Sequence, residues 1–489
     1  MKHFLKFFLA VSLTLSCTFS AFAQTDSIDV FIQHQMQKRR IPGLNLAIVR
    51  HGKIIKTGYY GIANIQDSIA VNPKTVFTIN SITKAFVGVA ILQLVEEGKL
   101  KLDLPISNYL TDIPETWKTV KVQQLLSHTS GIPDLVDEEE AVMIADNFDL
   151  SLKKVLTMPN DFATGSAFRY NQTNYYLLGL IINKLSGITF QQYITKNQLE
   201  KVGMPLTIQS GFGATKELVP NAASQYQFAK GKLNNMFFSF PAPLQTAAGM
   251  SATASELAKW VIALQNMVLL KQKSSLEALW KPDILNNGKT SGFSGLLNGY
   301  AAGWPIIVRN EHPAVAPVGG GRSAVFVYPK DDLSIIILTN LSGGTPDGFI
   351  DELAGLFIPD MKAANGFGMS PSAKSLKLTL DKNGYKNVDE TIKKLKAKNK
   401  NFILTETEVN DWGYKLVAQK RLKDALELFK LNVSLYPSSS NAYDSLGETY
   451  AELEMYDLAL TNYEKAFKLN PKNKSAEVII AKLKELLKK

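Results

Sequence analysis

The segment over residues 76–87, Val-Phe-Thr-Ile-Asn-Ser-Ile-Thr-Lys-Ala-Phe-Val, constrains this chain more than any other. It places a Ser-x-x-Lys motif, Ser81 to Lys84, where a β-prone run turns into an apolar helix. Residues three apart in a helix lie on one face, so Lys84 is expected one turn beyond Ser81 on the same side. The free N–H groups of a first helical turn favour negative charge there. Because a hydroxyl is a weak nucleophile until a neighbouring base removes its proton, the motif predicts a nucleophilic serine with a lysine partner.

A second Ser-x-x-Lys motif begins at Ser151, and we interpret it as a solvated helix start. Ser81 differs in its surroundings, since apolar residues follow it at helical spacing as far as Val95. That helix then meets a stop at Gly98. Ser81 is therefore predicted to lie at the mouth of a buried helix.

The composition is that of an ordinary globular protein. The chain has 489 residues, of which 45% are hydrophobic and 20% are charged. This length predicts two to four domains. Its net charge is +10, and part of the excess lies in the Lys-rich C-terminal part. We interpret that part as a solvated helical surface. No stripe of Arg with interleaved aromatics supports nucleic-acid binding, so no nucleic-acid partner is predicted.

Residues 1–23 read as a signal peptide. A basic start up to Lys6 precedes an apolar run to Phe22, and Ala-Phe-Ala at 21–23 predicts cleavage before Gln24. The protein is therefore expected to be exported, to the periplasm or the outside of the cell. The single cysteine, Cys17, lies inside this segment; lipidation there stays an alternative, although Thr14 occupies a position that is Leu-like in lipoproteins. No later apolar run is long enough to span a bilayer, so no transmembrane anchor is predicted.

The apolar pattern of residues 24–362 predicts one large domain. Residues 44–50 and 54–60 flank a His-Gly-Lys turn and predict a hairpin. Three further strands are predicted at 303–308, 324–328 and 333–339, and the segment between about 100 and 285 is mostly helical in pattern. Strands at both ends of a domain that enclose a helical insert favour an α+β fold, with an antiparallel sheet flanked by helices and an all-helical lobe beside it.

The remaining chain divides into a linker and a repeat domain. Residues 363–404 begin with a stretch rich in Gly, Ser and Lys and are predicted to be a linker with one short helix from Val388 to Lys400. In residues 405–489, four positions recur after 34 residues: Gly413 and Gly447, Ala425 and Ala459, Phe429 and Tyr463, and Pro437 and Pro471. This period predicts an all-α tetratricopeptide-repeat domain, which the Val388 helix and the helix at 475–487 would cap. A groove for a protein or peptide and a structural lid or dimer contact are both open interpretations.

A second group of residues that bears on the function lies downstream, at 168–179: Phe-Arg-Tyr-Asn-Gln-Thr-Asn-Tyr-Tyr-Leu-Leu-Gly. Together with Ser81-Ile-Thr-Lys84, it resembles the serine β-lactamase and penicillin-binding-protein superfamily, in its class C-like branch. That branch also holds D-amino-acid peptidases and carboxylesterases. The segments at 124–131 and 248–253 and the Gly303-Trp304 pair fit the same resemblance, which covers roughly residues 30–345.

The resemblance implies roles for individual residues. Ser81 would be the nucleophile, Lys84 its base, and Tyr170 the tyrosine that shares proton transfer with the lysine. Gln172 stands where the Tyr-x-Asn motif of the family has Asn. Gln keeps the donors and the acceptor of an amide but is one methylene longer, so the substrate placement is expected to shift.

The third motif of the family is usually Lys-Thr-Gly or His-x-Gly, and here it reads Pro-Val-Gly at 317–319. The missing cation or imidazole argues against tight binding of a substrate carboxylate and against strong β-lactamase activity. Gly319 and Gly320 are predicted to line the substrate site, with the N–H of Gly320 and that of Ser81 forming an oxyanion hole. A plain tight turn is the alternative for these glycines. The direction of the Arg322 side chain is open.

The other polar residues carry weaker predictions. His128 is expected to shape the turn before Gly131, and the remaining histidines lack the spacing of metal ligands. Asp134, with the acidic residues 138–140, is interpreted as a solvated loop. No metal and no organic cofactor is predicted.

Two hypotheses for the function follow. The first is an exported serine hydrolase that forms an acyl-enzyme at Ser81 and acts on D-amino-acid peptides or small carboxylic esters, with weak or no β-lactamase activity. The second is a non-catalytic binding protein whose repeats recruit a partner. The expected partners are a small-molecule or peptide substrate and, through the repeats, another protein or a second copy of the chain.

Overall fold

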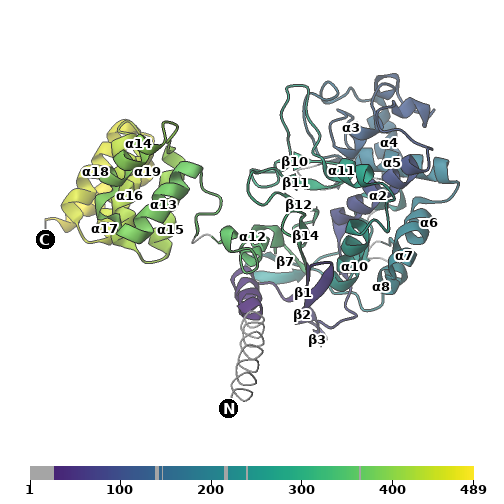
Figure 1. Cartoon of the computed structure of the whole chain (residues 1–489), viewed down its shortest axis with the longest axis horizontal. Helices are drawn as coiled ribbons and strands as arrows, with labels where there is room; N and C mark the ends of the chain where they lie inside the picture. Colours follow the sequence, from purple (N-terminus) through teal and green to yellow (C-terminus); the bar gives the residue numbers. More distant parts are fainter. Residues whose placement is uncertain are drawn as a thin grey trace, which may run out of the picture. The chain divides into compact units, whose positions relative to one another are not determined.

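The computed structural model describes residues 27–137, 142–145, 147–213, 218–237, 241–362 and 365–488. The chain divides between Leu356 and Phe357 into two compact units, which are described separately (Figure 1). The predicted signal peptide, Cys17 and the acidic residues 138–140 lie outside the described residues.

The first unit is built on an antiparallel sheet of nine described strands, in the order β10-β11-β12-β14-β15-β1-β2-β3, with β13 paired to β14. The strands are β1 (Gly43–Arg50), β2 (Lys53–Asn64), β3 (Ile69–Ala70), β10 (Gly299–Tyr300), β11 (Pro305–Ile307), β12 (Ala314–Val315), β13 (Val318–Gly319), β14 (Ser323–Tyr328) and β15 (Leu333–Thr339). Smaller sheets join β4 (Phe77–Thr78) to β9 (Ser251–Ala252), β5 (Val136–Asp137) to β6 (Val142–Met143), and β7 (Tyr226–Ala229) to β8 (Lys232–Asn235) and β16 (Leu341–Ser342).

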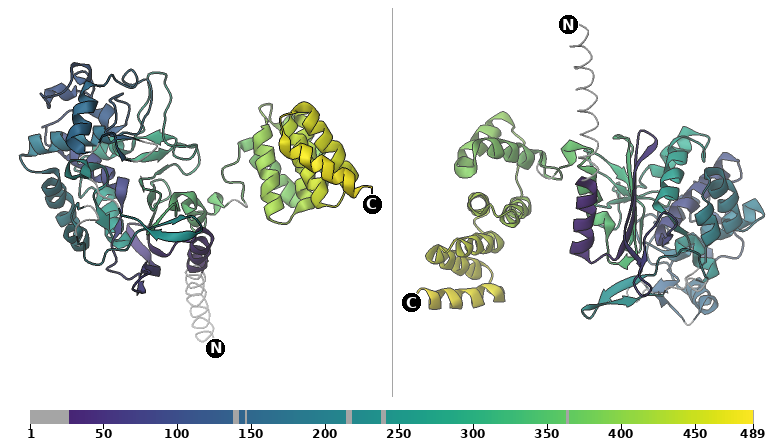
Figure 2. Two further views of the ribbon diagram at one scale, coloured as in Figure 1. Left: turned by 180° about the vertical axis from the view of Figure 1, so that it is seen from behind. Right: turned by 90° about the horizontal axis from the view of Figure 1, so that it is seen from below.

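The centre of the sheet joins the two ends of the unit. Strand β1 pairs with β2 on one side and with β15 on the other, in a register that sets Leu44 opposite Thr339. All seven residues of β15 are buried, as expected for a continuous apolar run covered on both faces. Helix α10 (Ala254–Gln265) packs on one face, while the helix over residues 27–39 and α12 (Ile350–Ala354) lie on the other (Figure 2). The predicted α+β fold is confirmed.

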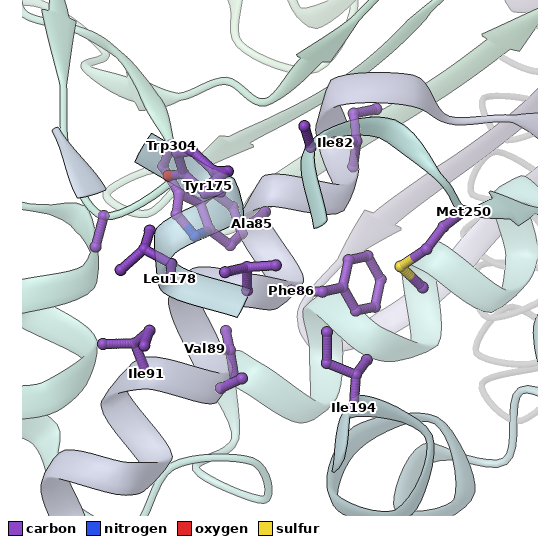
Figure 3. Close-up of a cluster of buried hydrophobic side chains, with 14 of the residues drawn as sticks. Ile82, Ala85, Phe86, Val89, Ile91, Tyr175, Leu178, Ile194, Met250 and Trp304 are labelled. Atoms are coloured by element: carbon purple, nitrogen blue, oxygen red, sulfur yellow. The ribbon is translucent and has the colours of Figure 1, made fainter. Parts of the chain in front are cut away.

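The helical lobe contains α3 (Val122–Leu126), α4 (Phe148–Thr157), α5 (Gln172–Ser186), α6 (Phe190–Ile194), α7 (Glu200–Val202), α8 (Pro205–Ser210), α9 (Gln245–Ala248) and α11 (Lys273–Trp280). Helix α2 (Thr83–Glu96) runs through the core, and its residues 83–94 are all buried. Figure 3 shows Phe86 and Val89 of this helix among side chains of other elements; the Phe86 ring stacks on Trp260 with centroids 4.0 Å apart. A helix that is apolar on all sides is stable only inside a core. Burial of each large apolar side chain stabilises the fold by about 1.5–3 kcal/mol.

The second unit is all-α. Its helices are α13 (Pro371–Asn383), α14 (Val388–Lys398), α15 (Glu406–Ala418), α16 (Leu422–Leu435), α17 (Ser440–Glu452), α18 (Tyr456–Leu469) and α19 (Lys474–Leu486). The 34-residue period corresponds to the pairs α15–α16 and α17–α18. A Cβ on Gly413 would lie 2.5 Å from the ring of Phe429, and one on Gly447 would lie 3.0 Å from the ring of Tyr463. The repeated glycine is thus what lets each pair of helices approach closely.

The interpretation of residues 363–404 as a linker is wrong for most of the segment. Residues 371–383 form α13, and α14 matches the one helix that was expected. Leu376 and Leu380 of α13 are fully buried in the same apolar cluster as Trp412 and Phe429 of the repeats. The many Lys and Ser residues made the segment resemble a linker, but it is an amphipathic helix whose apolar face packs on the core of the repeats.

We predict that Gly413→Ala destabilises the second unit by about 1–3 kcal/mol, because the added methyl group overpacks the contact with Phe429. Gly447→Ala is expected to have a smaller effect, because its methyl group would meet Tyr463 at a longer distance. Hydrogen exchange of the α15–α18 amides in the full chain measures both. Ser475→Ala, at an exposed position of α19, is the control for the gain in helix propensity. Equal protection in Gly413→Ala and the native chain would contradict the prediction.

Candidate functional site

Ser81 lies in a single 3₁₀ turn, η1 (Asn80–Ile82), between β4 and α2. Asn80 has a positive φ of 47°, a strained conformation that Asn tolerates better than most residues. The turn is fixed to the segment before β9, because Ile79 N donates to Met250 O (3.0 Å) and Met250 N donates to Thr83 Oγ1 (3.2 Å). The sequence motif placed Ser81 in the first helical turn; it stands in the turn just before the α-helix.

Lys84 is carried into the core by α2 and is fully buried. Its Nζ donates to Gln172 Oε1 (2.9 Å) and to Ala247 O (2.9 Å), and it lies 4.5 Å from the centroid of the Tyr170 ring. Burial lowers the pKa of Lys84 to about 7, and the carboxylate of Asp134 opposes that shift. A large fraction of this amine is therefore neutral near pH 7, as a general base requires.

Asp134 is a residue of this site that the sequence did not reveal. It is only 6% exposed, and its Oδ1 accepts hydrogen bonds from the backbone N–H groups of Gln172 (2.9 Å), Thr173 (3.3 Å) and Val136 (3.3 Å). Burial raises its pKa to about 6, while those bonds and Lys84 act in the opposite direction. The interpretation as part of a solvated acidic loop is wrong: the following glutamates suggested solvent, whereas Asp134 continues the buried segment after Gly131.

Gln172 is the first residue of α5, and the N-terminus of that helix is held by two side chains. Asp134 accepts from the first two N–H groups, and Asn171 Oδ1 accepts from Asn174 N (3.0 Å). These bonds satisfy the free donors that every helix start exposes. They also fix the residue whose amide oxygen meets Lys84.

Tyr170 approaches from the segment just before α5. Its Oη is buried and, among the described residues, makes no well-aligned hydrogen bond, although the hydroxyl of Ser81 lies close to it. Burial raises its pKa, and the nearby hydroxyl of Ser81 lowers it by a smaller amount, so the phenol keeps its proton at neutral pH. The structure thus brings Ser81, Lys84, Tyr170 and Gln172 to one place.

The ring of His128 packs against the ring of Tyr170, with the two centroids 4.5 Å apart. Its Nδ1 accepts from Asn171 N (3.2 Å), and its carbonyl accepts from Arg169 N (3.0 Å). Burial and the charge of Lys84 hold the pKa of His128 well below its usual value, so the ring is neutral. These contacts agree with the structural role expected for His128.

Gly319 and Gly320 face the Ser81 turn. A Cβ on Gly319 would lie 2.0 Å from Ile79 O, so only glycine fits there. Gly320 and Gly321 have φ values of 55° and 61° and close the hairpin between β13 and β14. The tight turn expected as one interpretation of these glycines is present, and it packs closely against the segment before Ser81; the substrate-lining role stays a prediction. Arg322 is buried and donates to Gln225 Oε1 and Gly320 O.

The second Ser-x-x-Lys motif is elsewhere. Ser151 lies inside α4, and its Oγ accepts from Ala145 N (3.1 Å). Ser151 is helical, as expected, but it is fully buried, so the prediction that it is exposed to solvent is wrong.

A pocket with an empty volume of about 790 Å³ opens beside β4 and β9, and Thr78, Ser251 and Gln225 are among its lining residues. None of its described lining residues is charged. In the described part of the chain, no group of three or more His, Cys, Asp or Glu could hold a metal ion. No described helix is long and apolar enough to cross a membrane.

Comparison with known proteins agrees with this geometry. The Beta-lactamase family profile matches residues 28–358, and a Tetratricopeptide repeat profile matches residues 440–473. Protein flp of Staphylococcus aureus is 28% identical over 336 residues, which are 67% of this chain and 65% of that protein. The matched part thus spans slightly less than two thirds of that relative.

Two further relatives carry penicillin-binding names. Putative penicillin-binding protein PbpX of Bacillus subtilis is 32% identical over 228 residues, or 46% of this chain and 56% of that protein. The octameric penicillin-binding protein homologue from Pyrococcus abyssi has a similar structure, with a TM-score of 0.60, 25% identity, and coverage of 72% of this chain and 81% of that one. The chain therefore belongs to the beta-lactamase family, whose members are generally serine hydrolases, and carries a tetratricopeptide repeat in its C-terminal unit.

Proposed function

We propose that this protein is an exported serine hydrolase that forms an acyl-enzyme at Ser81 and acts on D-amino-acid peptides or small carboxylic esters. One observation carries the proposal: a fully buried lysine whose pKa lies near 7 stands one turn beyond a serine, against the ring of a tyrosine. A buried amine of this kind is costly for folding, and such groups concentrate at functional sites.

In the acylation step, Ser81 Oγ attacks the carbonyl carbon of the substrate. The serine proton passes to neutral Lys84, directly or through the phenol of Tyr170, and the carbonyl oxygen becomes the oxyanion. When the tetrahedral intermediate collapses, the bond from the carbonyl carbon to the leaving nitrogen or oxygen breaks, and the leaving group takes up the proton. Tyr170 acts as a relay and not as a phenolate, because burial keeps its hydroxyl protonated.

Deacylation repeats these transfers with water. Water attacks the acyl carbon, and its proton passes to neutral Lys84, directly or through the phenol of Tyr170. When the tetrahedral intermediate collapses, the bond from the acyl carbon to Ser81 Oγ breaks, and Ser81 takes the proton back from Lys84. Gln172 orients the lysine in both steps, because its amide oxygen accepts a hydrogen bond from Nζ (2.9 Å).

The proposed substrate class follows from the third motif. In this chain the motif lacks the Lys or His that would bind a substrate carboxylate. Its absence favours uncharged groups next to the scissile bond and weak or absent β-lactamase activity. The repeat domain supports an additional role in binding a protein partner or a second copy of the chain.

The first prediction concerns the nucleophile. After incubation with a fluorophosphonate, intact-mass spectrometry should show one covalent adduct, which peptide mapping places on Ser81. The adduct should be absent in Ser81→Ala and present in Ser151→Ala, the control at the second Ser-x-x-Lys motif. Incubation with a penicillin and turnover of p-nitrophenyl esters are followed in parallel. No adduct with either reagent and no ester turnover would favour the non-catalytic binding protein.

The second prediction concerns Lys84→Met, which keeps the length of the side chain and removes the amine. Ester turnover should fall at least about a hundredfold, in line with the usual contribution of a general base. Circular dichroism and the melting temperature check that the variant is folded, because loss of the amine leaves Gln172 Oε1 and Ala247 O without their donor. Near-normal turnover by the folded variant would show that another group takes the proton.

The third prediction concerns pH. Lys84 must be neutral to accept a proton, so the acylation rate should rise as the pH passes upward through about 7. Asp134→Asn removes the negative charge that raises the pKa of Lys84, so this rise should move to lower pH. The rate of fluorophosphonate labelling against pH measures the shift. Asp112→Asn, at an exposed position, is the control, and an unshifted profile in Asp134→Asn would rule out the coupling.

A further inference from the structure

The hairpin that follows β13 holds a second group of contacts that the reaction scheme above does not use. Arg322 N donates to Gly319 O (2.9 Å), and Arg322 Nε donates to Gly320 O (3.4 Å). The carbonyl of Gly319 and the N–H of Gly320 belong to the same planar peptide unit and point in opposite directions. Arg322 therefore fixes both peptide planes that flank Gly320, one through its backbone and one through its side chain.

This fixation matters because Gly320 is followed by another glycine in a left-handed conformation, with φ of 55° and 61° at the two positions. Glycine has more backbone freedom than any other residue. A donor that stabilises an oxyanion is effective only if it is already oriented before charge develops. A pair of glycines at this place needs an external constraint. Thr345 N donates to Gly321 O (2.9 Å), and the side chain of Arg322 donates to Gly320 O (3.4 Å).

Arg322 is itself held on several sides. Its carbonyl accepts from Thr339 N (2.8 Å) and Thr339 Oγ1 (3.0 Å) on strand β15. Its Nη1 donates to Gln225 Oε1, and Gln225 is 7% exposed and lines the pocket beside β4 and β9. The next residue, Ser323, donates to Thr78 O (3.0 Å) on the strand that leads to Ser81. The arginine thus links the central sheet, the pocket wall and the glycine turn.

Arg322 also places a positive charge behind this turn. The side chain is 2% exposed, and burial lowers its pKa to about 10, so it is charged at neutral pH. The family motif that would supply Lys or His reads Pro-Val-Gly in this chain. Arg322 supplies a cation in the same hairpin at a different position, where the guanidinium contacts Gly320 O and Gln225 Oε1.

We propose that the Arg322 side chain is a positioning residue for the oxyanion hole. By holding Gly320 O it restrains the peptide after Gly320, and so keeps the Gly320 N–H, whose own peptide is held by the backbone bond from Arg322 N to Gly319 O, oriented toward the oxygen of the tetrahedral intermediate. Gln225 anchors the guanidinium for this purpose. The inference rests on the proposed function, because it requires an acyl transfer at Ser81. It assigns to Arg322 a role in stabilising the transition state and no direct contact with the substrate.

The test compares Arg322→Met, Arg322→Lys and Gln225→Met with the native full-length chain. Arg322→Met should lower kcat for a p-nitrophenyl ester by about tenfold to a hundredfold, less than the loss of a direct oxyanion-hole donor costs, with a smaller change in KM. The rate of fluorophosphonate labelling should fall by a similar factor. The affinity for a phenylboronic acid, whose tetrahedral adduct presents an oxygen to the same donors, should fall more than KM rises. Arg322→Lys should recover part of the loss.

Arg309→Met is the matched control. Arg309 forms a bidentate ion pair with Asp351, so its loss should lower the melting temperature and leave kcat per labelled site unchanged. If Arg322→Met does not fold, Gln225→Met carries the test, because it frees the guanidinium without removing it; a reduced kcat is then expected.

The inference is overturned if folded Arg322→Met, or Gln225→Met in its place, keeps the native kcat, labelling rate and boronate affinity. A native chain that no fluorophosphonate labels and that hydrolyses no ester would overturn the proposed function itself. A native chain that reacts, together with variants that react equally well, removes the role of Arg322 alone.

Discussion

The burial of the Lys84 amine in the protein core, on the apolar helix α2, is the constraint on which the rest of the site depends. An amine without water is stable only if fixed acceptors replace the water, and here Gln172 Oε1 and Ala247 O do so. Each acceptor comes from a different element, so the position of α5 and of α9 is tied to one nitrogen atom. The same desolvation that makes the arrangement costly brings the pKa of Lys84 to about 7 and gives the amine its chemistry.

Further buried polar residues surround this amine and its direct partners. Asp134 holds the start of α5 and supplies a compensating negative charge, while neutral His128 supports the ring of Tyr170. On the opposite side, the glycine turn packs against Ile79 and is fixed by Arg322. Strain accumulates at the junction, where Asn80 takes a left-handed conformation just before the nucleophile. The packed core around α2 holds this strain in place.

Much of the fold could be predicted because its signals are local. The runs at 44–50 and 333–339 are strands in the structure, and the 34-residue period predicts the close helix contacts found at Gly413 and Gly447. The segment 371–383 was missed because its polar residues dominate the composition, while its helix is stabilised by burial of Leu376 and Leu380 against the repeats. A short amphipathic helix of this kind depends on a partner surface that is distant in the sequence.

By itself, the sequence determined the residue types of the site: a serine and a lysine at helical spacing, a tyrosine and an amide before a second helix, and a glycine turn. Their convergence was inferred from resemblance, and only the tertiary structure decided the electrostatics. Asp134 looked solvated beside a run of glutamates, yet the fold buries it at the N-terminus of α5 near Lys84. The direction of Arg322 was likewise open, because a long side chain on a hairpin can turn to either face. Burial and side-chain direction depend on which distant segments pack together, and local spacing carries no information about that.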